Sequence, residues 1–489
     1  MERNAVLSVS DKAGLEVTSE FLISQGYRLF CTSGTKSYLE GKKVKCSSIE
    51  SLTSTPEILG GRVKTLSFQL LAGILAKERD DKEIKKLGYR PIDLVYVEPY
   101  DFRGRFLAGE KDLTEFIDIG GITLLRSAAK NFSRVIAVVG KRNMERVVAE
   151  MRDGEVTLEL RRSLASEVFR FTSLYDYVIS EWFDGKGENF TVGGSNLLEL
   201  RYGENPHQSA KIYATFPPFF EMLKEGKEIS FNNIMDAWSG WDLVLRLGKN
   251  SCAVVKHGSP CGAAVGPDPL GRAYESDPVS AYGGIIALNG KIGESEAEYL
   301  KGKYVEVVIA SDFSRRALDL LSKRRNLRIL RGNEDCYRIP EIRTAGNVIL
   351  VQEWNRRSTL NLQVRSGELS REVEEDIRFG WEVVKSVKSN AIILVGNGQL
   401  LSSCGGQPNR IDAVKIAIER AKSSNRIHEK AVLISDGFFP FADSIETIWS
   451  NGIRNVAAPT GSLRDEEVIS AARKYGINFV DVGERGFRH

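Results

Sequence analysis

Short apolar runs that alternate with amphipathic stretches are the feature that most constrains the fold of this chain. The run Ala5–Val9 predicts a strand, Gly14–Gln25 predicts a helix that stops at Gly26, and Arg28–Cys31 predicts the next strand. Strands that alternate with helices are typical of a mostly parallel sheet with helices on its faces. We therefore expect an α/β fold.

The alternation continues on both sides of a glycine-rich stretch. Residues 184–195 hold four glycines, which marks the expected domain boundary. Before it, a long amphipathic helix is predicted over residues 160–182, with strands at Ile92–Val97 and Arg134–Val139. Beyond it, strands are predicted at Cys252–Val255, Gly284–Leu288, Val305–Ala310, Val348–Val351, Ala391–Val395, Ala431–Ile434 and Ile477–Val482. We expect one domain over residues 1–190 and a second over 195–489, with subdomains at 195–365 and 366–489.

Composition excludes several classes of protein. Lys and Arg number 68 against 65 Asp and Glu, a net charge of +3, which argues against a broad nucleic-acid-binding surface. No apolar run approaches the ~18 residues of a membrane span, and the start lacks the pattern of a signal peptide. The six cysteines include no Cys-x-x-Cys pair, so reduced and mostly buried thiols are expected. We predict a cytoplasmic protein that binds neither nucleic acid nor membranes.

Two early loops have the composition of an anion-binding site. Ser8–Lys12 follows the first predicted strand, and Thr32–Thr35 follows the second. Backbone N–H groups at a helix start, together with hydroxyl groups and a lysine, are suited to hold a phosphate group. Each loop alone is equally compatible with simple helix capping. Two such loops at neighbouring strand ends favour a ligand site, because open α/β sheets bind ligands there.

Further segments add cations and glycines to the first domain. Gly60–Leu66 carries two cations after a glycine pair, and Asp118–Gly121 begins a short helical stretch that ends near Lys130. Lys130 lies among alanines next to a strand, where desolvation would lower its pKa into a range useful for proton transfer. The alternative interpretation is an ordinary solvated lysine.

The second domain holds a dense polar segment and a Lys–His pair. Leu200–Gln208 is rich in polar, charged and turn-forming residues and has no amphipathic period. Lys256 and His257 directly follow an apolar strand, which suits His257 to act as a general base while Lys256 holds developing negative charge. An ordinary loop histidine is the alternative. The pair Pro260-Cys261 could begin a zinc-deaminase signature, but Ala264 replaces its second cysteine, so we predict no metal site.

Taken in order, these segments resemble a bifunctional purine-biosynthesis family. Its members fuse the formyltransferase that acts on phosphoribosylaminoimidazole-carboxamide (AICAR) to inosine monophosphate (IMP) cyclohydrolase. The resemblance covers the whole chain and is carried by Ser8–Lys12, Gly61–Thr65, Ile117–Gly121, Ala128–Asn131, Arg201–Gln208, Lys388–Ala391 and Arg464–Val468.

The resemblance implies a fold, an assembly and two reactions. The first domain would be a Rossmann-like, methylglyoxal-synthase-like parallel sheet, and the second a pair of cytidine-deaminase-like subdomains without zinc. The family forms homodimers that share transformylase sites between subunits. The reactions are formyl transfer from 10-formyltetrahydrofolate to the amine of AICAR, giving FAICAR, and then cyclodehydration of FAICAR to IMP.

The resemblance also assigns the cyclohydrolase residues. It implies catalytic roles for Lys64, Tyr100, Asp118 and Lys130, with Lys130 in proton transfer. Backbone N–H groups near Gly120 would stabilise the oxyanion. The implied substrate-binding residues are Ser10, Lys12, Ser33, Gly34, Thr35, Arg62, Thr65, Gly120 and Gly121.

For the transformylase, the resemblance implies that Lys256, His257 and Asn390 act at the amine. That amine is a poor nucleophile because its lone pair is delocalised into the imidazole ring, so a general base is needed, and His257 is the candidate. The implied nucleotide contacts are Arg201, Tyr202, Gly283, Glu306, Arg410, Phe438 and Arg485. The implied folate contacts are Phe438, Pro440, Asp443 and Ser462.

Two positions depart from the family's usual pattern. Ser67 stands where a histidine is usual, and Glu98 stands where an asparagine is usual. A charged Glu98 would repel an anionic nucleotide unless it were protonated or turned away. Two alternatives therefore stay open. One is a transformylase with an impaired cyclohydrolase domain, and the other is a non-catalytic regulator that binds purine nucleotides.

Overall fold

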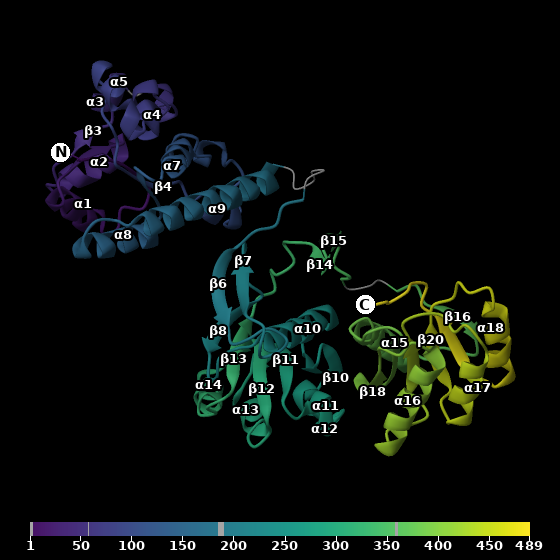
Figure 1. Ribbon diagram of the computed structural model, residues 1–489. Helices are drawn as coiled ribbons and strands as arrows, with labels where there is room; N and C mark the ends of the chain where they lie inside the picture. Colours follow the sequence, from purple (N-terminus) through teal and green to yellow (C-terminus); the bar gives the residue numbers. More distant parts are fainter. Residues whose placement is uncertain (1–2, 57, 184–189, 357–359) are drawn as a thin grey trace. The chain divides into compact units, whose positions relative to one another are not determined.

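The computed structural model describes residues 3–56, 58–183, 190–356 and 360–489 (Figure 1). The chain divides into two compact units, Met1–Gly194 and Ser195–His489. Much of the glycine-rich stretch expected at the domain boundary, residues 184–189, lies outside the described residues.

The first unit is a three-layer α/β structure. Its strands are β1 (Arg3–Val9), β2 (Tyr27–Cys31), β3 (Ser47–Ser48), β4 (Leu94–Glu98) and β5 (Ile136–Val139). Its helices are α1 (Leu15–Ser24), α2 (Ser33–Gly41), α3 (Glu50–Thr53), α4 (Phe68–Leu75), α5 (Asp81–Lys86), α6 (Phe102–Leu107), α7 (Gly120–Lys130), α8 (Lys141–Asp153) and α9 (Leu158–Phe183). All strands pair in parallel in the order β3-β2-β1-β4-β5.

Alternate side chains of the central strand enter different cores, as expected of a strand buried on both faces. Leu7 packs with residues of α1, α2 and α8 on one face, whereas Val6 packs with residues of α4, α7 and α9 on the other. The long helix predicted over residues 160–182 is α9. The α/β class with an N-terminal parallel sheet is therefore confirmed.

The second unit is built on a mixed sheet of 12 strands. Its first half contains α10 (Phe231–Leu247), β9 (Ser251–Lys256), β10 (Ser259–Val265), α11 (Pro269–Glu275), α12 (Pro278–Ala281), β11 (Gly284–Ile292), α13 (Glu294–Tyr299), β12 (Val305–Phe313), α14 (Arg315–Ser322) and β13 (Arg328–Gly332). Its second half contains α15 (Arg371–Val384), β17 (Ile392–Gly396), β18 (Gln399–Cys404), α16 (Arg410–Ser423), β19 (Val432–Ser435), α17 (Asp443–Ser450), β20 (Asn455–Ala458), α18 (Asp465–Lys474) and β21 (Asn478–Asp481).

The two halves repeat one pattern. Each begins with a helix and a β-hairpin, continues through parallel strands linked by helices, and ends beside an antiparallel edge strand, β8 (Phe220–Lys224) or β16 (Gln363–Ser366). The central strands β10 and β18 pair antiparallel and join the halves in one sheet. Residues of α10 and α15, among them Trp241 and Trp381, lie in one continuous core on the shared face. Separate cores on the other face contain residues of α11 and α14 in one half and α16 to α18 in the other.

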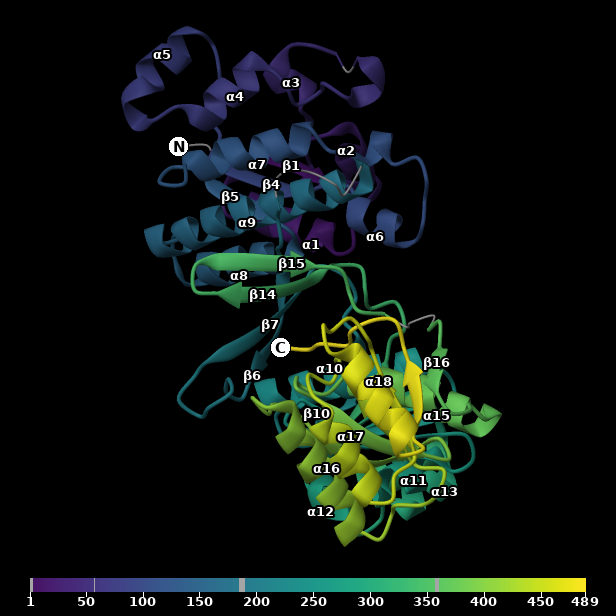
Figure 2. The ribbon, with the colours of Figure 1, turned by 90° about the vertical axis from the view of Figure 1, so that its right-hand side faces the viewer.

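Two hairpins lie outside this sheet. One pairs β6 (Ser195–Leu200) with β7 (Ala210–Ala214), and the other pairs β14 (Glu341–Ala345) with β15 (Val348–Gln352) (Figure 2). The run Val348–Val351, predicted as a strand from its apolar character, is part of β15, yet its side chains are exposed.

Candidate active sites

The carboxyl ends of β1, β2 and β4 meet at one edge of the parallel sheet. The chain leaves β1 toward β2 on one side and returns to β4 on the other, so the crevice between β1 and β4 is a topological switch point. The loop after β1 is tied to the end of β4, because Ser10 Oγ donates to Pro99 O at 2.8 Å. Lys12 Nζ donates to Ser10 O at 3.2 Å and stays on the same loop.

The second predicted phosphate loop forms the start of α2. Ser33, Gly34 and Thr35 are its first three residues, so their backbone N–H groups lie in the first turn, at the end of the helix that attracts anions. The hydroxyl of Thr35 is buried and accepts from Val9 N at 3.1 Å. Thr35 therefore holds α2 against the end of β1, and its hydroxyl is occupied by this contact.

The 61–65 segment meets the start of α7. A Cβ on Gly120 would lie 2.1 Å from Thr65 Oγ1, so only glycine fits there. Asp118 Oδ1 accepts from Gly121 N at 2.7 Å. Burial raises the pKa of Asp118, while the Gly121 N–H and the positive charge of Lys64 act against this rise. A carboxyl group, a lysine and a helix start are thereby gathered at the same sheet edge.

Tyr100 and Arg62 border this group. The Tyr100 ring is exposed and packs edge-on against Phe116 at 6.3 Å between ring centroids. Arg62 is also exposed and forms a two-pronged pair with Glu115 at 2.9 and 3.1 Å. The Arg62 guanidinium is therefore already bound to the Glu115 carboxylate, and an anionic ligand would have to compete with Glu115 for it.

Glu98 lies beside the loop after β1, close enough for the charge of Asp11 to act on its carboxyl group. Its Oε1 accepts from Lys141 N, at the first residue of α8, at 3.0 Å. Burial raises the pKa of Glu98, and the Lys141 N–H partly offsets this rise. Lys141 Nζ donates to Ala13 O at 3.3 Å and brings a cation to the loop after β1. The sequence reasoning missed Lys141, although it stands directly after a strand end.

Ser67 has a structural role in the first unit. It is the N-cap of α4, and its Oγ accepts from Leu70 N at 3.2 Å.

Replacing Ser67 with alanine should lower the free energy of unfolding of the first unit by about 1 kcal/mol, because the cap is lost. Urea denaturation followed by circular dichroism measures the change, and Ser67→Asn, which retains a capping oxygen, is the control. A loss of ring-closing activity without loss of stability would contradict this purely structural role.

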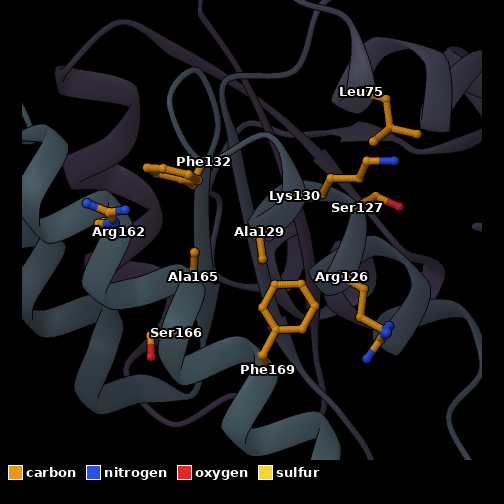
Figure 3. A pocket seen from close by; sticks show the side chains of 10 residues that line it. All are labelled: Leu75, Arg126, Ser127, Ala129, Lys130, Phe132, Arg162, Ala165, Ser166 and Phe169. Carbon is orange, nitrogen blue, oxygen red and sulfur yellow. The ribbon is translucent and has the colours of Figure 1, made fainter.

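Lys130 lies far from the other residues predicted for the cyclohydrolase site. It ends α7, ten residues or about 15 Å from Gly120. Because α7 runs back between the parallel strands β4 and β5, its end lies at the opposite edge of the sheet. There Lys130 lines a cavity of about 630 Å³ with Arg126 and Phe169 (Figure 3). The expected desolvation is absent, since Lys130 is exposed.

In the second unit, Lys256 and His257 occupy the β9–β10 hairpin. Lys256 Nζ donates to Tyr282 O at 2.8 Å, and the His257 side chain is exposed. The backbone N–H groups of His257 and Gly258 both donate to the carboxylate of Asp236 on α10, at 3.1 and 2.6 Å. Burial raises the pKa of Asp236.

The predicted nucleotide contacts Gly283 and Glu306 lie beside this hairpin. Glu306 accepts from Asn233 Nδ2 at 2.8 Å, and its negative charge acts on neighbouring Asp236. Gly283 has a φ of 74°, and a Cβ there would lie 3.2 Å from the Tyr304 ring.

Arg201 and Tyr202 lie near the same carboxylates. The Arg201 guanidinium lies 5.1 Å from the centroid of the Tyr202 ring. Both residues act electrostatically on Arg328, which pairs with Glu306 at 3.9 Å.

A second cluster surrounds Asn390. Arg410 is buried and donates to Asn390 Oδ1 at 2.6 Å, to Asp436 Oδ1 at 2.5 Å and to Ser435 Oγ at 2.8 Å. Asn390 Nδ2 donates to Gln407 O at 2.9 Å. Arg410 therefore orients the Asn390 amide and is itself neutralised by Asp436, a residue that the sequence reasoning missed.

The predicted folate contacts follow the ends of neighbouring parallel strands. Phe438 and Pro440 come after β19, and Ser462 comes after β20. Asp443 is exposed at the first position of α17. Arg485 is exposed after β21, and its guanidinium lies 5.3 Å from the centroid of the Phe487 ring.

Strand pairing places the predicted residues of the second unit along one edge of the sheet. Ser403 Oγ donates to Pro260 O at 3.2 Å, which fixes the end of β18 beside the start of β10. The end of β9, which leads to His257, and the start of β17, which follows Asn390, are three strand spacings apart. This corresponds to about 14 Å, with β10 and β18 between them. Within one chain the residues thus form two neighbouring groups.

Two further observations concern metals and membranes. Among the described residues, no group of three or more His, Cys, Asp or Glu side chains is arranged to hold a metal ion. None of the helices that the structure describes combines the length and apolar character needed to cross a membrane.

The fold defines a two-unit α/β protein in which polar and charged side chains gather at the strand ends of each sheet. A family model described as AICARFT/IMPCHase bienzyme matches residues 128–420, and one described as MGS-like domain matches residues 14–123. The chain belongs to the AICARFT/IMPCHase bienzyme family.

Relatives named bifunctional purine biosynthesis protein PurH match along the whole chain. The protein from Aquifex aeolicus is 40% identical over 99% of this chain and 100% of its own length. Those from Petrotoga mobilis and Clostridium acetobutylicum are each 39% identical, over 100% of both chains. A solved structure titled "Crystal structure of ForH" is 35% identical and covers 37% of this chain and 100% of its own, with a TM-score of 0.33.

Proposed function

We propose that this chain catalyses the last two steps of IMP synthesis. The second unit transfers a formyl group from 10-formyltetrahydrofolate to the amine of AICAR, and the first unit closes FAICAR to IMP with loss of water. The observation that carries this proposal is the full-length match to proteins with that bifunctional name, together with a Lys–His hairpin at one sheet edge. A folate-type formyl donor follows from the family, and 10-formyltetrahydrofolate is our specific proposal.

In formyl transfer, His257 is the general base. The AICAR amine attacks the formyl carbon, His257 takes the amine proton, and the C–N bond to tetrahydrofolate breaks as the proton is returned to the leaving nitrogen. Lys256 stabilises the negative oxygen of the tetrahedral intermediate. The Lys256 ammonium has three N–H donors. One of them binds Tyr282 O, so the other two are available to the substrate.

The remaining predicted residues of the second unit bind and orient. Asn390 is held by Arg410 and Gln407 at the same edge of the sheet, where we assign it to positioning of the substrate amine. Arg201, Tyr202, Gly283, Glu306 and Arg485 contact the nucleotide, and Phe438, Pro440, Asp443 and Ser462 contact the folate. Their common edge of the sheet supports this assignment.

In ring closure, the substrate already supplies proximity, because the carboxamide nitrogen attacks the neighbouring formyl carbon within one molecule. We assign proton removal from that nitrogen to Asp118 and charge stabilisation to Lys64 and the N–H groups at the start of α7. The nucleotide phosphate lies at the loops of Ser10 and Lys12 and at the start of α2. Lys130 is given no contact with the reacting groups of its own chain, because it ends at the opposite edge.

The first unit retains the features that ring closure needs. A charged Glu98 would repel an anionic nucleotide, but its carboxylate is bound to the Lys141 N–H, and the Lys141 ammonium brings a compensating positive charge to the same loop. This favours the bifunctional enzyme over a transformylase with an impaired first domain.

Two assays test the proposal. Purified protein is given AICAR with 10-formyltetrahydrofolate while tetrahydrofolate release is followed, and is separately given FAICAR while IMP is followed. We expect both products. Release of tetrahydrofolate without conversion of FAICAR would overturn the bifunctional assignment, and silence in both assays would leave only a nucleotide-binding regulator.

We also propose a cytoplasmic homodimer. The cysteines are free thiols, which supports a reducing compartment. In β15, the consecutive side chains of Val348, Ile349, Leu350 and Val351 are 57%, 51%, 54% and 44% exposed, a run that is typical of an interface.

Ile349→Glu should raise the Kd of the dimer by about thirtyfold or more, because a charge would be buried in the interface. Sedimentation equilibrium measures the change against Val17→Glu, a control at an isolated exposed valine on α1. Equal Kd values for Ile349→Glu and the unmodified chain would exclude β15 from the interface.

A further inference from the structure

The β9–β10 hairpin that carries His257 has a two-residue turn of the kind in which both residues adopt positive φ. Its two turn residues, His257 and Gly258, have φ angles of 54° and 72°, both in the left-handed region. Glycine adopts this region freely, but a histidine does so only where its surroundings compensate the strain. A contact from outside the hairpin would add support for His257 in this conformation.

Asp236 supplies that support from α10. Its Oδ2 accepts from His257 N at 3.1 Å and its Oδ1 accepts from Gly258 N at 2.6 Å, so both turn amides converge on one carboxylate. Bonds from N–H groups to a charged acceptor are stronger than bonds between neutral groups. They act on the backbone of the residue that carries the proposed base.

The position of Asp236 is itself fixed. α10 begins with a reciprocal cap in which Ser230 Oγ accepts from Asn233 N and Asn233 Oδ1 accepts from Ser230 N. Asn233 Nδ2 also reaches Glu306, on the neighbouring strand β12, at 2.8 Å. The first turn of α10, which leads to Asp236, is thereby anchored to the sheet.

The second half of the unit contains the same pair of hydrogen bonds from two turn amides to one carboxylate. Asp376 of α15 accepts from Asn397 N at 2.8 Å and from Gly398 N at 2.6 Å, in the β17–β18 hairpin. Asn397 and Gly398 have φ angles of 54° and 64°. In both halves the carboxylate precedes the first turn residue by 21 positions. The repeated fold uses this bond pair twice, and only the first hairpin carries a Lys–His pair.

We propose that Asp236 is a positioning residue for formyl transfer, whose carboxylate sets the hairpin backbone so that the His257 imidazole meets the substrate amine. This inference rests on the proposed function. Asp236 is assigned no contact with the reacting groups, and it acts through the backbone of His257. Asp376 has the same bonds and no part in the chemistry, which makes it a matched control.

The test compares Asp236→Asn with Asp376→Asn in the full chain. Each replacement removes one of two acceptor oxygens from a hairpin, so both should lower the melting temperature by similar amounts. Asp236→Asn should lower kcat of formyl transfer about 10- to 100-fold with KM for AICAR changed less than threefold, because misplacement of a reacting group by ~1 Å can cost about 10²-fold. Asp376→Asn should keep kcat within twofold of the unmodified chain.

Two further readouts separate positioning from general damage. Hydrogen exchange should become faster at the amides of residues 257 and 258 in Asp236→Asn, and FAICAR closure should be unchanged in both variants. Asp236→Glu, which keeps two carboxylate oxygens on a longer side chain, should lose less kcat than Asp236→Asn. It serves as the test variant if Asp236→Asn does not fold.

The outcomes distinguish this inference from the proposed function. An unmodified chain without formyl transfer would overturn the proposed function. An active chain in which Asp236→Asn keeps full kcat, or in which Asp376→Asn loses as much, would overturn the positioning role of Asp236 alone.

Discussion

Replacing His257 with asparagine is expected to lower the rate of formyl transfer by about 10²- to 10⁴-fold, the usual contribution of a general base. Ring closure of FAICAR should stay within about twofold, since the first unit is a separate compact body. The expected loss is in kcat, because the imidazole acts on the proton of a bound amine. Initial rates of tetrahydrofolate release measure it.

Asparagine is chosen because the fold already shows that it fits. Asn397 occupies the same place in the β17–β18 hairpin, with the φ of 54° that His257 adopts. Asparagine tolerates the left-handed region better than alanine, so His257→Asn should keep the hairpin and remove only the base. Full formyl transfer by this variant would contradict the role of His257.

The reciprocal variant is the control. Asn397→His places a histidine in the second hairpin, which lies at the other edge of the sheet beside Arg272 and Val265. It should change neither formyl transfer nor ring closure. Together the two variants show whether formyl transfer depends on the His257 side chain or on the hairpin geometry that both halves share.

Sequence reasoning identified much of the fold because buried strands are apolar. The predicted runs at 252–255, 284–288 and 305–310 are parts of β9, β11 and β12. It did not predict β10, whose sequence contains Pro260 and Gly262, or β20, whose four residues include an asparagine and two alanines. Those strands are stabilised by their neighbours in the sheet more than by their own composition.

Sites at strand ends were predictable for a related reason. Residues that directly follow parallel strands gather at one edge of the sheet, as the loops of Ser10 and Ser33 do in the structure. Lys130 was grouped with them by motif, yet it is separated from Gly120 by the full length of a helix. A rise of about 1.5 Å per residue was enough to predict this separation from the sequence.

Asp236 and Asp376 could not be found in this way. Their partners lie 21 positions further along the chain and are backbone N–H groups, which leave no trace in residue identity. The sequence does carry a trace of the duplication, because Asp236-x-x-x-Gly240-Trp241 returns 140 residues later as Asp376-x-x-x-Gly380-Trp381, but only strand order and hydrogen bonds connect these aspartates to the hairpin turns.

Replacing Asp118 with asparagine is expected to lower ring closure by about 10²- to 10⁴-fold and to leave formyl transfer unchanged. The carboxylate is the proposed acceptor of the carboxamide proton, and an amide cannot take that role. The Asp118→Asn side chain would retain a carbonyl oxygen for the Gly121 N–H, so the start of α7 should keep its geometry. Conversion of FAICAR to IMP measures the effect.

The pH dependence sharpens this prediction. Burial raises the pKa of Asp118 above its usual value near 3.8, so protonation on acidification begins at a higher pH than for a solvated aspartate. A base works only when deprotonated, so the rate of ring closure should fall as the pH decreases through that raised pKa. The Asp118→Asn variant should lack this acidic limb.

Asp101 provides the matched control for Asp118. Its Oδ1 accepts from the N–H of Gly104, three residues ahead, at 2.8 Å, which is the same local bond that joins Asp118 to Gly121 at 2.7 Å. Asp101 is exposed, however, and stands at the start of α6. If Asp101→Asn lowered ring closure as much as Asp118→Asn, the loss would come from helix capping. A loss confined to Asp118→Asn, with its acidic limb gone, would support proton transfer by that half-buried carboxyl group.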